Sequence, residues 1–329
     1  MQKIKIKFCD FWDGFDCKED EIYKNLSKNY KLEIVGDNPD VVIYSSFGNE
    51  FLNYLNAKLI FYATEHYFPN SLYADYLITS KPANDSKSFR MANFPFYPFV
   101  QEFINQNNSS EYKKFPKTEF CNFIYNNKNA KNRNNFFKLL SNYKKVDSFG
   151  KLFNNKTIND FNDIPQNLHW KEEKIHILKR YKFTICFENG LRPYSFSEKV
   201  IQALQAGSIP IYWGDNSIYD YVNPDAIIDA RKFNNMNKVV EYIEYLENNK
   251  TAMEKIKNAN PFFKDSEIYE QTEKKIEQFL INCIEDKIIK QEKKYIKIIF
   301  LKVFNKVLGF IYKKYWKTIS FKRRFFGGW

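Results

Sequence analysis

The sequence predicts an α/β protein built from two successive Rossmann-like domains that face each other across a cleft. Two observations support this prediction. Short apolar runs alternate with helical segments along residues 1–105, and the same alternation restarts over residues 118–266 after a polar stretch. Strands that alternate with helices favour a parallel, doubly wound sheet. Ligands of such sheets bind at the carboxyl ends of the strands, so a ligand site is expected in the cleft.

The first domain is expected to span residues 1–105. Its opening strand alternates polar and apolar residues, and a later run at 41–45 is apolar throughout, as in a strand buried on both faces. The expected strands are 4–8, 31–35, 41–45, 59–62 and 76–79, with helices at 19–28 and 50–56. Residues 106–117 belong to a polar stretch without apolar periodicity and are interpreted as the interdomain linker.

The second domain, residues 118–266, repeats this pattern. Its helix at 197–206 is closed by Gly207, a residue that commonly follows a helix C-terminus. The expected strands are 120–125, 145–149, 183–187 and 209–213, with helices at 132–140, 172–181, 197–206 and 239–248. A further helix at 267–286 is expected to close the fold before a tail at 287–329.

The charge of the chain is concentrated at one end. The net charge is +12, but residues 287–329 hold 13 Lys and Arg and one acid, Glu292, whereas residues 1–286 are neutral. A nucleic-acid-binding domain carries its basic charge within the fold, so no nucleic-acid partner is expected. With 44% hydrophobic and 19% aromatic residues, the chain has ample material for buried cores, which excludes global disorder.

The five cysteines have neither disulfide-framework nor zinc-knuckle spacing, and we expect reduced thiols in an intracellular protein. No stretch of 18 apolar residues is present that could span a membrane as a helix. No Asp-x-Asp pair ends a strand before the expected ligand site, so no metal site is expected.

The clearest chemical signal lies around the third strand of the second domain. That strand is expected to end at Glu188 and Asn189, and the next helix has Ser197, Glu198 and Lys199 in its first turn. Helix N-termini attract phosphates, a lysine there adds charge for a pyrophosphate, and a carboxylate suits ribose hydroxyls. The alternative is structural: Ser197 caps the helix, Glu198 complements its dipole and Lys199 is solvated.

This order of residues closely resembles the donor-site signature of the α-1,3/4-fucosyltransferases. F-E-N at 187–189 is followed, ten residues further on, by S-E-K at 197–199 and then by A-x-x-A-G-x-I-P-I-Y-W-G at 203–214. Weaker similarity covers most of residues 1–280. It includes an N-x-x-x-x-R-x-x-F-like element containing Arg133, a V-D-x-x-G-R-like element at 146–151, an F-Y-T-G-E-like element at 61–65 and an R-M-P-L-Y-Y-like element at 90–97.

The resemblance implies an inverting transferase of the GT-B architecture that uses GDP-fucose as donor substrate and needs no metal or other cofactor. By match, Glu65 is the acceptor-domain glutamate that acts as general base; a solvated loop carboxylate is the alternative. The donor-binding residues expected at or beside the matched positions are Arg133, Lys151, Glu188, Asn189, Tyr194, Ser195, Glu198 and Lys199. The candidate acceptor contacts are His66 and Trp12. His66 stands beside Glu65, with an incidental loop histidine as the alternative, and the Trp12 ring can stack on a sugar or pack in the core.

Two departures from the family pattern bear on the donor. Lys151 stands where the family usually has Arg, which removes a bidentate contact to phosphate. Ser195 occupies the position of a family tyrosine, with Tyr194 one place earlier, so either Tyr194 takes over that role or the contact is lost. The spacing of Glu188 and Glu198 is ten, not the eight typical of many retaining GT-B enzymes, which argues against a retaining mechanism.

The tail is predicted to be a basic amphipathic helix. Lys residues at 302, 306, 313 and 317 share one helix face, with Phe, Leu, Val, Tyr and Trp around the other. Residues 300–326 are therefore expected to bind an anionic membrane surface, with packing on the catalytic domains or on a partner as the alternative. The expected location is cytoplasmic, peripheral on the inner face of the membrane.

The sequence thus predicts a transferase that moves L-fucose from GDP-fucose to a GlcNAc or Glc hydroxyl, α-1,3, of a bacterial surface oligosaccharide. Two alternatives stay open. The same scaffold could use another nucleotide sugar, as Ser195 and Lys151 suggest, or the protein could be a membrane-bound glycan- or nucleotide-binding protein that has lost catalysis.

Overall fold

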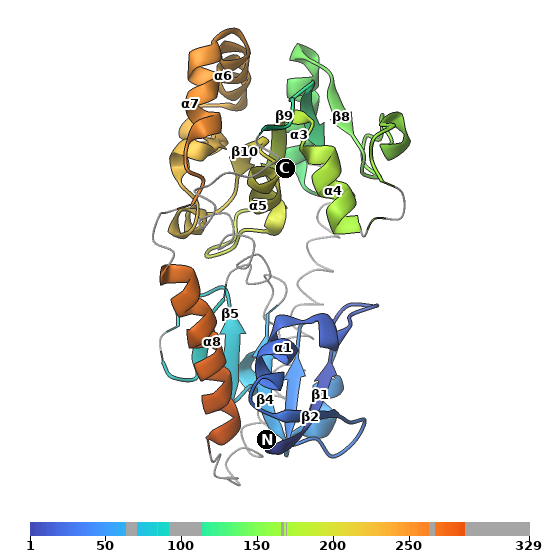
Figure 1. Cartoon of the computed structure of the whole chain (residues 1–329), viewed down its shortest axis with the longest axis vertical. Helices are drawn as coiled ribbons and strands as arrows, with labels where there is room; N and C mark the ends of the chain where they lie inside the picture. The colour runs from blue at the N-terminus through green and yellow to red at the C-terminus, as the bar shows by residue number, and fades with distance from the viewer. Residues whose placement is uncertain are drawn as a thin grey trace, which may run out of the picture.

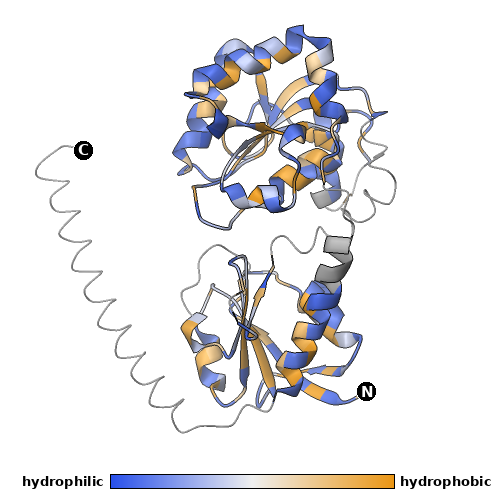
Figure 2. Ribbon diagram, turned by 90° about the vertical axis from the view of Figure 1, so that its left-hand side faces the viewer, coloured by the Kyte–Doolittle hydropathy of each residue, from blue (hydrophilic) through white to orange (hydrophobic). Residues whose placement is uncertain are grey.

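The computed structural model describes residues 1–63, 71–83, 85–91, 114–165, 168, 170–262 and 267–286. In this part of the chain, the strands form two entirely parallel sheets (Figure 1). The expected fold class, two parallel α/β sheets with helices, is confirmed. Figure 2 shows apolar residues concentrated along the strands of both sheets and hydrophilic residues on the outer faces of the helices.

The first sheet has six strands in the order β2-β1-β3-β4-β5-β6. Its strands are β1 (Lys3–Cys9), β2 (Lys31–Ile34), β3 (Val41–Tyr44), β4 (Lys58–Tyr62), β5 (Tyr76–Thr79) and β6 (Ser88–Arg90). Its helical segments are η1 (Cys17–Glu19), α1 (Glu21–Ser27), η2 (Glu50–Tyr54) and η3 (Ser71–Tyr73). All four residues of β3 are buried, as its apolar run predicts for a strand covered on both faces.

The second sheet has five strands in the order β11-β10-β9-β7-β8. Its strands are β7 (Glu119–Phe123), β8 (Val146–Ser148), β9 (Tyr181–Phe187), β10 (Ile209–Trp213) and β11 (Ile228–Asp229). The α-helices are α3 (Lys131–Tyr143), α4 (Trp170–Leu178), α5 (Glu198–Gln205), α6 (Met236–Asn248) and α7 (Lys250–Asn258). Short 3₁₀ turns complete it: η6 (Ile158–Asp160), η7 (Asn216–Asp220), η8 (Pro224–Ala226) and η9 (Ala230–Lys232).

Several sequence-based boundaries were wrong. The helix expected at 172–181 ends at Leu178, because Tyr181 already pairs with Glu119 in the sheet. The segment expected as a helix at 50–56 is a 3₁₀ turn. Strands β6 and β11 and helix α7 were not expected. The two strands have only three and two residues, too few for a periodic pattern, and they are defined by their pairing with β5 and β10.

The last described helix, α8 (Glu267–Glu285), packs against the first domain rather than the second (Figure 1). Lys58 Nζ donates to the carbonyl oxygens of Ile284 at 2.7 Å and Asp286 at 2.9 Å, and so caps the helix C-terminus. The side chains of Ile276, Phe279, Leu280 and Cys283 join the buried cluster that includes α1 and the first sheet. The chain therefore returns to its N-terminal half after the second sheet is complete.

The end of the expected linker, at Lys117, is hydrogen-bonded to the second domain. Lys117 Nζ donates to the carbonyl oxygens of Lys179 and Ala206, both at 2.7 Å, at the ends of α4 and α5. Burial lowers the pKa of Lys117 to about 7. Residues 101–113 of the polar stretch lie outside the described residues.

Each sheet has a topological switch point, where the strand order reverses. In the first sheet it lies between β1 and β3, and in the second between β7 and β9. Crevices outside the carboxyl ends of strands at such points are the preferred ligand sites of open α/β sheets. The arrow of β5 in Figure 1 points towards the second domain, and the parallel sheet gives its other strands the same sense.

Candidate active site

Arg133 lies at the switch point of the second sheet. It comes from the first turn of α3, and its side chain is almost completely buried. Its Nη1 donates to Asn189 Oδ1 at 2.8 Å and its Nη2 to the carbonyl of Asn127 at 3.0 Å, while its Cζ lies 3.8 Å from the centre of the Tyr125 ring. The structure thus brings together two of the expected donor-site residues, Arg133 and Asn189, from different elements.

Among the residues that the structure describes, the Arg133 guanidinium has no close counter-ion. Within the described part of the chain, no carboxylate oxygen lies within 4.0 Å of it, and its buried Nε has no hydrogen-bond partner. Burial lowers the pKa of this guanidinium from its ordinary value, although the nearby Tyr125 and Glu188 oppose the effect. A buried cation beside a strand end, with unused donor capacity, is suited to bind an anion.

Lys151 lies in the loop that follows β8. Its backbone N–H donates to Asn126 Oδ1 at 2.8 Å, and its side chain is exposed. The preceding residue must be glycine, because a Cβ on Gly150 would come within 2.2 Å of the carbonyl oxygen of Tyr125. This close approach joins the loops after β7 and β8 beside Arg133, which is the physical reason for the V-D-x-x-G pattern.

Asp147 of the same element has a structural role. Its carboxylate accepts from Tyr181 Oη and Lys156 Nζ, each at 2.8 Å. Those contacts lower its pKa, although burial opposes them. Asp147 thus ties β8 to the start of β9.

Glu188 holds the start of helix α5. Its Oε1 accepts from the backbone N–H of Ser197 at 2.8 Å and from the Ser197 hydroxyl at 2.7 Å. Ser197 is the N-cap residue, as expected, but its hydroxyl makes no capping hydrogen bond to the backbone of α5. The hydroxyl donates to Glu188 instead. Lys199 Nζ lies 2.6 Å from Ser197 Oγ and 3.7 Å from Glu188 Oε2. Glu188 therefore positions the N-terminus of α5, and Lys199 lies in the first turn of that helix.

A second lysine at this helix terminus was missed by the sequence analysis. Lys174 of α4 lies 4.0 Å from Glu198 Oε1, and Lys199 lies 3.9 Å from the same oxygen. Burial lowers the pKa of Lys174, and the charge of Lys199 acts in the same direction. Both lysines line a small hollow that is open to solvent, together with Tyr125 and Thr184. The sequence alone gave no reason to expect Lys174 here, because only the packing of α4 against α5 brings it to Glu198.

The loop before α5 separates Tyr194 from Ser195. Ser195 is 5% exposed, whereas the Tyr194 side chain is 43% exposed. Tyr194 has a left-handed backbone, with φ of 60°, and its N–H donates to Asp215 Oδ1 at 2.9 Å. Arg90 of the first domain lies with its Cζ 6.0 Å from the Tyr194 ring. Tyr194, not Ser195, therefore presents its side chain between the domains.

Trp12 lies at the switch point of the first sheet, in the loop that follows β1. Its ring is 45% exposed and packs edge-on against Phe15, with centroids 4.9 Å apart. Phe47, which follows β3 and is 50% exposed, lies 6.2 Å from Trp12 and was missed by the sequence analysis. Glu65 and His66 lie outside the described residues.

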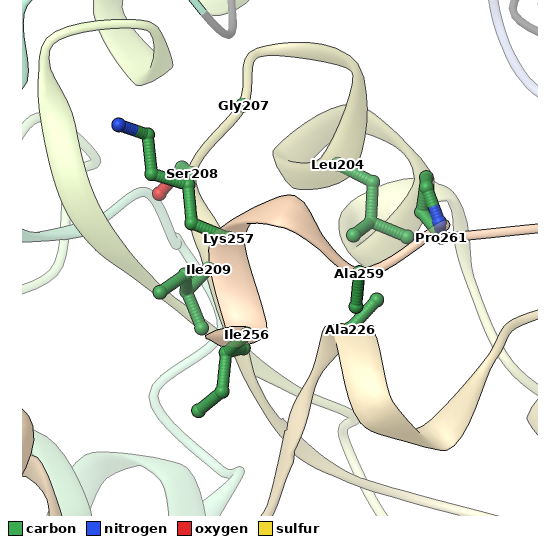
Figure 3. Close-up of a pocket in the computed structure, with 9 residues that line it drawn as sticks. All are labelled: Leu204, Gly207, Ser208, Ile209, Ala226, Ile256, Lys257, Ala259 and Pro261. Carbon is green, nitrogen blue, oxygen red and sulfur yellow. The ribbon is translucent and has the colours of Figure 1, made fainter. Parts of the chain in front are cut away.

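Another small hollow, open to solvent, lies beside the amino ends of the strands of the second sheet (Figure 3). It is lined by Gly207, Ser208 and Ile209 at the amino end of β10 and by residues near the end of α7. Within the described residues, no three His, Cys, Asp or Glu side chains are grouped to hold a metal ion. No described helix is both long and apolar enough to cross a membrane.

Two parallel α/β sheets, with the cations and helix terminus at the switch point of the second, define a two-domain protein of GT-B-like architecture. The chain matches the family model "Glycosyltransferase family 10 (fucosyltransferase) C-term" over residues 113–300. It also matches the "Alpha-(1,3)-fucosyltransferase FucT N-terminal domain" model over residues 6–99. The chain belongs to glycosyltransferase family 10, the fucosyltransferases.

Individual relatives agree with this assignment. The chain is 27% identical over 299 residues to the α-(1,3)-fucosyltransferase FucT of Helicobacter pylori, a match that covers 78% of this chain and 60% of that protein. It is 31% identical over 258 residues to the fucosyltransferase homologue R654 of Acanthamoeba polyphaga mimivirus, covering 72% of this chain and 39% of that protein. The chain thus spans less than two thirds of the length of both relatives.

Solved structures show the same fold. The crystal structure of an α1,3-fucosyltransferase superposes with a TM-score of 0.69 at 23% identity and covers 88% of this chain and 92% of its own. A crystal structure of α1,3-fucosyltransferase with GDP-fucose superposes with a TM-score of 0.68 at 23% identity, over 89% and 94% of the two chains.

Proposed function

We propose that this protein transfers L-fucose from GDP-fucose to a hydroxyl of an oligosaccharide. The observation that supports this most is that Arg133 and Lys199, the latter in the first turn of α5, both lie against Tyr125, with Arg133 Cζ 3.8 Å and Lys199 Nζ 5.9 Å from the centre of its ring. Two fixed cations and the N-terminus of a helix suit the two negative charges of the pyrophosphate in GDP-fucose. Glu198, held between Lys174 and Lys199, is the carboxylate for the ribose hydroxyls.

The proposed reaction inverts the anomeric carbon of fucose. The acceptor hydroxyl attacks that carbon opposite the nucleotide, the bond from the carbon to the β-phosphate oxygen breaks, and Glu65 takes the hydroxyl proton. The charge that develops on departing GDP is stabilised by Arg133 and Lys199, which are already fixed by their contacts before the reaction. We propose that the step needs no metal ion, because these cations supply the compensating charge.

The acceptor binds, in this proposal, along the carboxyl edge of the first sheet. Trp12 and Phe47 expose aromatic rings at its switch point, and the apolar face of a pyranose packs on such rings. We propose a GlcNAc or Glc residue of a bacterial surface oligosaccharide as acceptor, with α-1,3 linkage. We also propose that residues 300–326 hold the enzyme on the inner face of the cytoplasmic membrane through anionic lipid.

A donor screen tests this function. The protein is incubated with GDP-fucose, GDP-mannose, and UDP- and CMP-sugars, each with N-acetyllactosamine or lactose, and nucleotide release and glycan mass are measured. GDP release with a fucosylated product from GDP-fucose alone is expected. A preference for another nucleotide sugar would instead support the alternative donor suggested by Lys151 and Ser195. Binding of GDP without turnover of any donor would favour the inactive binding protein.

A further inference from the structure

Glu198 has two lysines beside one of its carboxylate oxygens. Lys174 Nζ of α4 lies 4.0 Å from Glu198 Oε1, and Lys199 Nζ of α5 lies 3.9 Å from the same oxygen. The two helices pack against each other (Figure 1), and Ile175 of α4 shares a buried cluster with Ala206 at the end of α5. One carboxylate therefore lies close to two ammonium groups that come from different helices.

Lys199 is shared between two carboxylates. Besides Glu198, it faces Glu188, whose Oε2 lies 3.7 Å from Lys199 Nζ. The same ammonium donates to Ser197 Oγ at 2.6 Å. A lysine ammonium has three N–H donors, so closer pairing of Lys199 with both carboxylates would leave it little capacity for a phosphate. Lys174 provides Glu198 with another cation, which limits this pairing.

Lys174 also decides the charge balance of the candidate site. The two cations proposed for the pyrophosphate, Arg133 and Lys199, are offset by two nearby carboxylates, Glu188 and Glu198. With Lys174 as the third cation, these five side chains carry one more positive than negative charge. Without it they would be neutral as a group, and a neutral group attracts a pyrophosphate less strongly than a positive one.

The Lys174 ammonium is unfavourable in its surroundings. Its side chain is 17% exposed. Burial lowers its pKa; the charge of Glu198 opposes this effect, and that of Lys199 adds to it. Glu198 thus favours the charged form of Lys174, and Lys174 in turn offsets the charge of Glu198. An apolar side chain would fill this place without the penalty of burying a charge, so the charge itself points to a role in the site.

We infer that Lys174 is a positioning residue of the donor site: it neutralises Glu198 and thereby leaves the Lys199 ammonium available for the pyrophosphate of the nucleotide. Lys174 acts through Glu198 and makes no contact with the nucleotide itself. This inference rests on the proposed function for the identity of the nucleotide. It follows that the contribution of Lys174 to nucleotide binding depends on the Glu198 carboxylate.

A double-mutant cycle measured with GDP tests this dependence. Calorimetry on the full chain gives the GDP affinity of the native protein, of Lys174→Met, of Glu198→Gln and of the variant with both substitutions. Lys174→Arg keeps the charge, and Lys174→Gln is a second neutral variant that replaces Lys174→Met if the latter does not fold. Lys238→Met is the matched control, because Lys238 is an exposed lysine that pairs with Glu241 at 2.6 Å on α6.

Lys174→Met is expected to weaken GDP binding roughly 10-fold, within the ~2- to 150-fold range of coupling between residues of one ion-pair network. In the Glu198→Gln background the same substitution should change GDP affinity less than about twofold, because no carboxylate is left to draw Lys199 away. Lys174→Arg should bind GDP within about threefold of the native protein, since it keeps the charge. Lys238→Met should bind GDP as the native protein does, because exposed ion pairs contribute little.

An equal loss of GDP affinity in both backgrounds would show that Lys174 acts on the nucleotide directly, and would overturn the positioning role. Unchanged GDP affinity in Lys174→Met would also overturn it. A loss in Lys174→Arg as large as in Lys174→Met would show that packing, and not charge, is responsible. Absence of GDP binding by the native protein would contradict this role and the proposed function together. Normal GDP binding without fucose transfer would contradict the proposed function and leave the role of Lys174 standing.

Discussion

Asp20→Asn should stabilise this protein at neutral pH. Asp20 is the N-cap of α1, and its carboxylate accepts from the N–H of Ile22 at 2.9 Å. Burial raises the pKa of Asp20 from 3.8 to about 6; the Ile22 hydrogen bond and Lys24 oppose this effect, and Glu21 adds to it. The folded state thus contains a carboxylate whose charge is unfavourable at pH 7.

The sign of the effect follows from proton binding. Between pH 4 and 6 the folded state keeps a proton on Asp20 that the unfolded state has released, so stability falls as pH rises through this window. The full loss is about 3 kcal/mol, since each pH unit of difference is worth about 1.4 kcal/mol. Asn caps a helix about as well as Asp but has no charge. The variant should therefore gain about 3 kcal/mol at pH 7.5 and only about 1 kcal/mol at pH 4.5.

Urea unfolding at these two pH values measures the difference. Asp16→Asn is the matched control, because Asp16 is an exposed N-cap aspartate whose side chain accepts from the N–H of Lys18 at 2.9 Å. A gain that is the same at both pH values would show that burial of the Asp20 charge is not its cause. No gain at pH 7.5 would refute the reasoning.

Four further predictions concern activity and the tail. Glu65→Gln should keep GDP-fucose binding but lower turnover by ~10²–10⁴, the usual contribution of a general base; unchanged turnover would remove Glu65 from that role. Lys199→Ala should weaken GDP binding about 10- to 150-fold, the range for a hydrogen bond to a charged group, whereas the exposed Lys238→Ala control should not; intact GDP affinity by calorimetry would exclude the pyrophosphate contact. Activity should survive EDTA, and complete loss restored by Mn²⁺ would contradict a metal-free step. Truncation after Asp286 should abolish sedimentation with anionic vesicles but spare transfer to soluble acceptors, and lost activity would instead favour packing of the tail on the catalytic domains.

The sequence predicted the architecture because the signals for it are local. Apolar runs such as 41–45 and 209–213 mark strands buried on both faces, and their alternation with helices allows few arrangements other than parallel sheets. The ordered signature from Asn189 to Lys199 identified the family by the same means. Short strands escaped prediction: the three residues of β6 carry no periodic pattern and are a strand only because β5 lies beside them.

The candidate site was predicted as a set of residues but not as an arrangement. The order of residues in the sequence cannot show that Glu188 accepts a hydrogen bond from the N-cap residue of α5. Nor can it show that Lys174, from another helix, lies beside Glu198. Phe47 joins Trp12 only because β1 and β3 are neighbours in the sheet. Whether Tyr194 or Ser195 faces the cleft is decided by one backbone angle, the left-handed φ of Tyr194, which Asp215 fixes from the end of β10. Local sequence determines periodicity and residue type, whereas the direction of a loop side chain depends on contacts made across the fold.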